Sequence, residues 1–386
     1  MNPYGIGRRV RLKPGREVSL ARLHPWVYRG ALGAVQGASG AVEVLGADGM
    51  RLGVALAGEP GASLALRMVT WGDEVWSRET LRFRLASASA LRRRLPLDAE
   101  AFRLVNAEGD GLPGLVIDRY GPWAVIEPFM TAWEDYLSDV VAFLRDAEGV
   151  AGVLVRRGKR VNVALGELPA APVAVREGPW VLLADLVGGQ KTGLFLDQRD
   201  NRRRVFELAR DCRVLNLFSY SGGFGVAALA GGARRVVNVD ASAAALELAK
   251  KTWQVNGFAV EEGDFVRGDA FRLAAELHAA GERFELVIVD PPAFVSHRSR
   301  LAEGLRGYRE INRQALRLTS AGALLLTCSC SALVSEQLFA EVLLTAALDV
   351  GRRLTVLGRW GAGPDHPVSL YCPETRHLKA WLCSVE

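Results

Sequence analysis

The chain has 386 residues, of which 49% are hydrophobic, and carries a formal net charge of +5 with a pI near 9.1. This length predicts two or three domains with apolar cores of their own. No run of eighteen apolar residues occurs, and the first ten residues lack the apolar core of a signal peptide, which argues against a membrane-spanning or secreted protein. We therefore expect a cytoplasmic protein with no membrane partner.

The cysteines are too few and too scattered for a disulfide framework. Their number is odd, and they lack the paired spacing of a zinc site. The five are Cys212, Cys328, Cys330, Cys372 and Cys383. We expect free thiols and no bound metal.

Arginine-rich clusters recur along the whole chain. Guanidinium groups bind phosphate in a bidentate manner, so such clusters suit a nucleic acid, although a solvated helix face has the same composition. The clusters are residues 8–16, 92–94, 156–160 and 202–204. Their recurrence favours an RNA or DNA partner.

The N-terminal half of the sequence, to about residue 180, predicts two small modules. Residues 8–72 contain short apolar runs broken by glycine, which is typical of a small β-barrel-like domain. The aromatic segment His24–Tyr28 lies beside a turn there, and such aromatics most often belong to a core. From Glu74 to about residue 180, two helical stretches alternate with a hairpin and further strands, which indicates a compact α+β domain.

The C-terminal half alternates strand-like and helix-like segments. This order predicts an α/β fold, a doubly wound parallel sheet with helices on both faces. The expected strands are 214–218, 235–239, 265–268, 284–289, 323–327, 353–357 and 377–383. We expect three domains, 1–73, 74–180 and 181–386.

A glycine-rich turn follows the first of these strands. Ser221-Gly222-Gly223 lets a ligand approach bare backbone, and Asp240 ends the second strand, where a doubly wound sheet places a carboxylate on ribose hydroxyls. The turn also fits a dinucleotide fingerprint, so a nicotinamide or flavin cofactor, S-adenosylmethionine and a structural turn all remain open at this point. In each ligand-binding case the sequence predicts a nucleoside crevice.

Polar residues stand at the predicted strand ends, where such sheets bind ligands. They are Asn216, Asp240, Asp269, Asp290 and the pair Cys328 and Cys330. The polar segment 190–202 is either a wall of the cofactor site or a capped helix start with Asp197 near the N-cap and a basic face behind it. One crevice would thus collect a cofactor acid, a base-reading carboxylate and a thiol.

Six motifs in this order resemble the class I S-adenosylmethionine-dependent 23S rRNA cytosine-5 methyltransferases, and the resemblance covers almost the whole chain. They are Lys191-Thr-Gly-Leu-Phe-Leu-Asp-Gln-Arg-Asp-Asn201, Leu215-Asn-Leu-Phe-Ser-Tyr-Ser-Gly-Gly-Phe224, Asn238-Val-Asp-Ala-Ser242, Asp290-Pro-Pro-Ala-Phe294, Thr327-Cys-Ser-Cys-Ser331 and Asp365-His-Pro367. The resemblance implies an N-terminal PUA RNA-binding domain, a small α+β domain and a Rossmann-like methyltransferase domain.

It further implies S-adenosylmethionine as cofactor and 23S rRNA or a large-subunit precursor as partner, and it allows a homodimer. The cofactor residues it implies are Phe195, Asp197, Gln198, Asn216, Ser219, Tyr220, Ser221, Gly222, Asp240, Ser242, Asp269 and Asp290. The catalytic residues are Asp290 and a cysteine. The pattern Thr-x-Ser-Cys-Ser assigns the nucleophile to Cys330, whereas the Thr-Cys-Ser of other RNA cytosine-5 methyltransferases would assign it to Cys328.

Carbon 5 of cytosine is a poor nucleophile, so its methylation requires a thiolate that adds at carbon 6. The acid Asp290 would then contact the N3/N4 edge of the base, and Phe294 is a candidate surface for the flipped ring. Ala293 stands where related enzymes carry a second cysteine, so the base that removes the proton is unassigned. Guanine N-methylation and a non-catalytic RNA-binding role are the alternatives.

Overall fold

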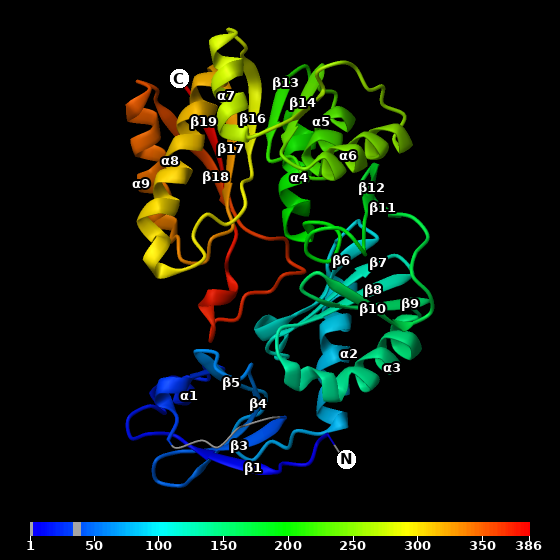
Figure 1. Ribbon diagram of the computed structural model, residues 1–386, viewed down its shortest axis with the longest axis vertical. Helices are drawn as coiled ribbons and strands as arrows, with labels where there is room; N and C mark the ends of the chain where they lie inside the picture. The colour runs from blue at the N-terminus through cyan, green and yellow to red at the C-terminus, as the bar shows by residue number, and fades with distance from the viewer. Residues whose placement is uncertain (1–2, 34–39) are drawn as a thin grey trace. The chain divides into compact units, whose positions relative to one another are not determined.

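The computed structural model describes residues 3–33 and 40–386, and the chain divides into two compact units, each described by itself (Figure 1). Unit 1 consists of Met1–Val173, Asp185–Gly193 and Pro364–Thr375. Unit 2 consists of Ala174–Ala184, Leu194–Gly363 and Arg376–Glu386. Within the described ranges, no helix is both long and apolar enough to cross a membrane.

Unit 1 begins with a five-stranded sheet in the order β1-β3-β4-β5-β2, which confirms the small β module expected for residues 8–72. The elements are β1 (Arg8–Arg11), α1 (Val18–Ala21), β2 (Trp26–Tyr28), β3 (Ala41–Leu45), β4 (Arg51–Ala57) and β5 (Leu64–Met68). The assignment of the aromatic segment to the core is wrong for two residues. Val27 is buried, but Trp26 is half-buried and Tyr28 is 49% exposed, because alternate side chains of a strand point to opposite faces.

The second part of unit 1 is another five-stranded sheet, in the order β10-β9-β8-β7-β6, packed against two helices. Its elements are α2 (Arg78–Arg94), β6 (Ala101–Asn106), β7 (Leu115–Tyr120), β8 (Trp123–Pro128), α3 (Leu137–Glu148), β9 (Gly152–Arg157) and β10 (Arg160–Leu165). The core is rich in aromatics, with Trp76, Trp133 and Tyr136 fully buried. The predicted α+β module is therefore present, with β10 as a strand that the sequence did not indicate.

Unit 2 contains a seven-stranded sheet in the order β15-β14-β13-β16-β17-β19-β18. Its strands are β13 (Arg213–Leu217), β14 (Arg235–Asp240), β15 (Phe265–Arg267), β16 (Phe284–Val289), β17 (Thr319–Ser329), β18 (Leu354–Trp360) and β19 (Lys379–Val385). The first five are parallel, but β19 runs antiparallel to both β17 and β18. The expectation of an all-parallel sheet is thus wrong at one strand, because no crossover helix connects β18 to β19.

Two groups of three helices cover the sheet of unit 2 (Figure 1). The first group is α4 (Arg199–Leu208), α5 (Gly223–Ala230) and α6 (Ala243–Val255), and the second is α7 (Ala270–Ala279), α8 (Leu301–Leu318) and α9 (Glu336–Asp349). A two-stranded sheet of β11 (Val173–Glu177) and β12 (Trp180–Ala184) packs beside α6 through β12. The core lies between helices and sheet, so the polar strand ends remain at the carboxyl edge.

Three of the arginine clusters each contain one arginine that is almost fully buried. Arg92 forms a bidentate pair with Asp110, Arg156 donates to the carbonyl of Leu186, and Arg202 forms a bidentate pair with Glu177. These side chains serve the fold, since a buried guanidinium requires a partner. These three arginines are therefore not available to bind phosphate, whatever the role of the other members of their clusters.

Candidate active site

The turn between β13 and α5 has an unusual backbone that brings it close to its neighbours. Gly222 has a φ of 76°, and a Cβ there would lie 2.8 Å from the Cβ of Ala249. Phe218 and Tyr220 also have positive φ values, 61° and 47°. Such conformations cost free energy and are concentrated at functional sites. The predicted glycine turn is therefore a tight, strained loop.

Asp240 ends β14 directly beside this turn, as predicted. Its Oδ2 accepts a hydrogen bond from the Tyr220 N–H, and its Oδ1 accepts one from the Ser242 N–H, both at 2.8 Å. The two bonds fix the carboxylate while each oxygen keeps further lone pairs. The Ser242 hydroxyl accepts from the Ala245 N–H and caps α6. Asp240 is thus oriented so that it can accept hydrogen bonds from hydroxyl groups of a ligand, whereas the Ser242 side chain caps α6.

Two buried polar atoms near the turn have no hydrogen-bond partner in the described part of the chain: Oδ1 of Asn216 and the hydroxyl of Ser219. The Asn216 amide donates to the Asn238 side chain at 3.0 Å, which holds it in place. Leaving a buried polar atom without a partner costs about 1–3 kcal/mol. These two atoms, the strained glycine turn and the fixed carboxylate fit a nucleoside cofactor with a polar amino-acid end.

The segment before α4 forms a 3₁₀ turn, η4 (Leu196–Gln198), beside the glycine turn. The Phe195 ring contacts the Tyr220 ring edge-on at 5.2 Å, and its carbonyl accepts from the buried Arg202. Asp197 lies directly before Gln198, the N-cap residue of α4, so it stands near the N-cap as the second alternative expected. The Gln198 side chain makes no capping hydrogen bond, and Asp197 Oδ2 lies 3.2 Å from Nε2 of His377.

Asp269 follows β15, next to β14, but its side chain is exposed and accepts from the Arg272 N–H as the N-cap of α7. The Asp269 side chain therefore caps α7 and is exposed, unlike most of the predicted cofactor residues. Tyr220, Ser221 and Gly222 lie in the turn itself. The predicted set is otherwise brought together at one edge of the sheet.

Asp290 directly follows β16 and is hydrogen-bonded to the segment before α4. Its Oδ1 accepts from the Gln198 amide at 2.9 Å, and Gln198 in turn accepts from Asn201 at 2.6 Å. The Pro291-Pro292 pair that follows has no backbone donors and limits the movement of the turn. Asp290 is therefore held in one orientation by side chains from the segment that also carries Phe195.

The two candidate thiols have different surroundings. Cys328 is fully buried in β17, and burial, reinforced by the charge of Asp290, raises the pKa of its thiol well above the usual value. Cys330 lies just beyond the end of β17 and is half-buried, with its Sγ 3.7 Å from the Pro291 carbonyl oxygen. Only the thiolate is a good nucleophile, so the surroundings favour reactivity at Cys330.

Lys379, at the start of β19, is a residue that the sequence did not single out. It is 5% exposed, and its Nζ donates to the carbonyl oxygens of Ser331 and His377, both at 2.9 Å. Burial lowers its pKa, while the negative charges of Glu336 and of the Cys330 thiolate oppose that shift. A buried ammonium therefore lies within electrostatic range of Cys330. No sequence motif marks it, because the contact depends on the antiparallel register of β19.

Phe294 is part of an aromatic cluster. Its ring packs against Tyr308 at 4.7 Å and also contacts Phe271 and Phe218, while remaining partly exposed. The Tyr308 hydroxyl lies 2.9 Å from the Ser331 hydroxyl. The cluster positions the segments on both sides of Cys330, and it leaves only part of the Phe294 ring to receive a base.

The strand order, the glycine turn after the first strand and the acid at the end of the second define a Rossmann-like nucleoside-binding domain. A family model described as S-adenosylmethionine-dependent methyltransferase matches residues 162–367, and a model of a PUA-like domain matches residues 10–71. The chain belongs to the S-adenosylmethionine-dependent methyltransferase family and carries a PUA-like domain, as the motifs predicted.

Similar proteins agree with this assignment. A relative from Klebsiella pneumoniae, named Ribosomal RNA large subunit methyltransferase I, is 35% identical over 98% of both chains. A solved structure named as a putative SAM-dependent methyltransferase from Streptococcus mutans has a TM-score of 0.87 and 21% identity, covering 97% of this chain and 99% of that one. A putative methyltransferase solved with SAH has a TM-score of 0.88 and 20% identity over the same shares.

Proposed function

We propose that this chain transfers a methyl group from S-adenosylmethionine to carbon 5 of a cytosine in large-subunit ribosomal RNA, in the cytoplasm, with Cys330 as the nucleophile. The observation that carries the proposal is the half-buried Cys330 thiol, which lies beyond the end of β17 beside the turn after Asp290. The name of the Klebsiella relative and the PUA-like domain support RNA as the substrate.

The residues at the β13 and β14 ends fit the cofactor. Asp240 would accept hydrogen bonds from the ribose hydroxyls, and the unpartnered Oδ1 of Asn216 and hydroxyl of Ser219 would bind the amino-acid end. Phe195 and Tyr220 would border the same crevice. When bound, S-adenosylmethionine supplies an electrophilic methyl group on a sulfonium.

Cys330 would act first. Its thiolate forms a bond to carbon 6 of the cytosine, and the electron pair of the C5–C6 double bond becomes available at carbon 5. Carbon 5 would then accept the methyl group, the methyl–sulfur bond would break with its electron pair remaining on sulfur, and the cofactor would leave as a neutral thioether. A base removes the proton from carbon 5, its electron pair re-forms the double bond, and the Cys330–carbon 6 bond breaks with the thiolate as the leaving group. The thiol is regenerated, and the net change is methyl for hydrogen.

Two neighbours would assist Cys330. The ammonium of Lys379 favours the thiolate over the neutral thiol, because an opposite charge nearby stabilises the ionised form. Asp290, held by Gln198, can accept a hydrogen bond from the exocyclic amino group of cytosine. Lys379 is a positioning residue in this proposal, since it acts through the thiol and does not touch the base.

The test uses ribosomal RNA transcribed with 5-fluorocytidine. Fluorine cannot leave as a proton, so an adduct formed through carbon 6 would persist and appear as a band stable to denaturant. We expect the adduct with the wild-type protein and with Cys328→Ser, and none with Cys330→Ser. An adduct that disappears with Cys328→Ser alone would reverse the thiol assignment.

A second measurement addresses the modified base. Unsubstituted RNA is incubated with methyl-labelled cofactor and digested to nucleosides, which are identified by mass spectrometry. We expect labelled 5-methylcytidine. Labelled methylguanosine would replace the proposal with guanine N-methylation, and complete absence of label would favour a non-catalytic RNA-binding role.

A further inference from the structure

Unit 1 contains a cavity of about 660 Å³ that plays no part in the methyl-transfer site. It is lined by residues of α1, by the segment from His24 to Tyr28 that includes β2, and by Leu370 and Tyr371 from the 364–375 segment of the same unit. Two parts of the sequence more than 300 residues apart thus form one cavity.

Aromatic side chains form one wall, and they are held in place. Trp26 donates its indole N–H to Glu108 at 2.8 Å, which fixes the plane of its ring. Its ring meets the His24 and Tyr28 rings edge-on, with centroids 5.6 and 6.5 Å apart. Rings held in this way lose little entropy when a ligand binds.

Another part of the lining is the tip of a closed loop. The Cys372 N–H donates to the Ser369 carbonyl, and Thr375 Oγ1 both accepts from the Ser369 N–H and donates to the Cys372 carbonyl. The two residues at the tip are apolar or aromatic and yet exposed, Leu370 by 92% and Tyr371 by 57%. A well-ordered loop that presents such side chains to solvent is typical of a binding surface.

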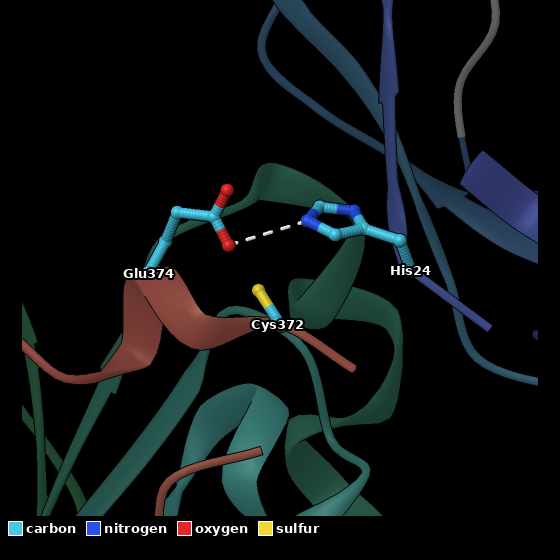
Figure 2. Close-up of side chains that lie close together, drawn as sticks. All are labelled: His24, Cys372 and Glu374. Atoms are coloured by element: carbon cyan, nitrogen blue, oxygen red, sulfur yellow. Dashed lines mark hydrogen bonds and ion pairs between the residues drawn. The ribbon is translucent and has the colours of Figure 1, made fainter. Parts of the chain in front are cut away.

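His24 and Glu374 connect the loop to the aromatic wall. Figure 2 shows them facing each other beside Cys372, with His24 Nε2 3.3 Å from Glu374 Oε2. The ligand atoms of the three residues lie within 4.8 Å of one another, as in a metal site. However, His24 Nδ1 accepts from the Trp26 N–H, so the ring proton is on Nε2 and points at Glu374. The arrangement therefore favours a hydrogen-bonded anchor over metal ligation.

The rim of the cavity is basic. Arg16 and Arg22 are exposed there, and among the described residues that line the cavity none is acidic. Guanidinium groups next to aromatic faces are the combination that binds single-stranded nucleic acid, through phosphate contacts and base stacking. A paired base does not expose its face, so the combination selects an unpaired nucleotide.

We propose that this cavity binds one unpaired nucleotide of the RNA substrate, with its base against Tyr371 and Trp26 and its phosphate at Arg16 and Arg22. The inference rests on the proposed function, because it takes RNA to be the substrate. It adds a second contact, outside the methyl-transfer site, that recognises an unpaired position in the RNA. The 369–375 loop is a required part of this contact.

The test uses the full-length protein and a 12-nucleotide single-stranded RNA that carries one 2-aminopurine, whose fluorescence falls when it stacks. Stacking on an aromatic ring contributes about 5- to 150-fold in affinity. We therefore expect Tyr371→Ala to weaken binding by that factor and to abolish the quenching, whereas Tyr371→Phe retains both. Phe83→Ala is the matched control, because Phe83 is an aromatic residue of α2 that is 72% exposed and lies outside the cavity.

Arg22→Ala should lower the slope of log affinity against log salt by about one, as for the loss of one phosphate contact. Equal RNA affinities for Tyr371→Ala and Phe83→Ala would overturn the proposal. Unchanged RNA affinity with weaker binding to large-subunit particles would also overturn it and assign the loop to a protein partner.

These measurements need no methyl transfer. If quenching depends on Tyr371 but no methylcytidine forms, the proposed reaction fails and the cavity stands. If methylcytidine forms and quenching does not depend on Tyr371, the proposed reaction stands and the proposal for the cavity fails.

Discussion

At the carboxyl end of β14, the Asp240 side chain receives hydrogen bonds from Tyr220 and Ser242, which lie within about twenty residues of it in sequence. At the end of β17, Cys330 instead has Pro291 and Lys379 as neighbours, 39 and about 50 residues away. The proposed cofactor half of the crevice is thus built mainly from one contiguous strand–turn–helix–strand segment, to which the segment before α4 adds Phe195. The reactive half is assembled from four separate segments.

This difference has a physical consequence. The cofactor half depends on local backbone geometry, so a substitution there changes binding without affecting distant elements. The reactive half depends on register, because β19 must run antiparallel beside β17 for Ser329 to pair with Lys379. Changes in the reactive half should therefore alter the rate and its pH dependence while leaving cofactor affinity unchanged.

The largest expected effect separates the two thiols. Cys330→Ser should lower methyl transfer by at least about 1,000-fold, because a hydroxyl is a far weaker nucleophile than a thiolate. Cofactor affinity, measured by calorimetry, should not change. Cys328→Ser should keep activity within about threefold, since the buried Cys328 thiol stays protonated. Loss of activity in Cys328→Ser alone would show that burial does not decide between the two.

The second effect concerns the cofactor half. Asp240→Ala should weaken S-adenosylmethionine binding by about 1.5–3 kcal/mol, the contribution of hydrogen bonds to a charged group. Calorimetry measures the change, and thermal unfolding checks that the turn still folds. Asp349→Ala, which removes an acid paired with Arg309 on the surface, is the control and should bind normally. Normal binding by Asp240→Ala would remove Asp240 from the site.

The third effect probes the long-range contact of the reactive half. Lys379→Met removes the positive charge that favours the Cys330 thiolate, so the rising limb of the pH–rate profile should move to higher pH. At neutral pH the rate should fall about tenfold. Lys379→Arg keeps the charge and should restore part of the profile. A uniform loss of rate at all pH values would indicate a purely structural role.

The smallest effect uses a buried thiol on β19. Burial raises the pKa of Cys383 from its ordinary value of 9.0 to about 11. The unfolded chain therefore ionises first as the pH rises, so the stabilisation is complete below about pH 9 and is lost between about pH 9 and 11. Between pH 7 and 10, the free energy of unfolding of wild type should fall about 1 kcal/mol more than that of Cys383→Ala. Chemical denaturation measures both, and equal slopes would contradict the burial argument.

The local sequence pattern was sufficient to predict those features that depend only on residues close together in the sequence. The glycine turn, Asp240 and the Asp290-Pro291-Pro292 turn were predicted, because a strand that ends in a turn places its next residues at the sheet edge whatever the rest of the chain does. The small β module and the α+β module followed from runs of apolar residues for the same reason.

Tertiary structure decided what depends on segments far apart in sequence. Cys328 and Cys330 lie two residues apart in one motif, and the sequence does not distinguish them. The structure does, because Cys328 is fully buried and Cys330 is only half-buried. Antiparallel pairing of β19 places Lys379 near Cys330, and buried carboxylates take Arg92 and Arg202 out of their basic clusters. Periodicity and motifs hold no information on which remote segments of the chain lie close together in the folded structure. The sequence by itself therefore determined the fold class and the polar residues at the ends of the strands, while the environment of the proposed nucleophile arose only from long-range packing.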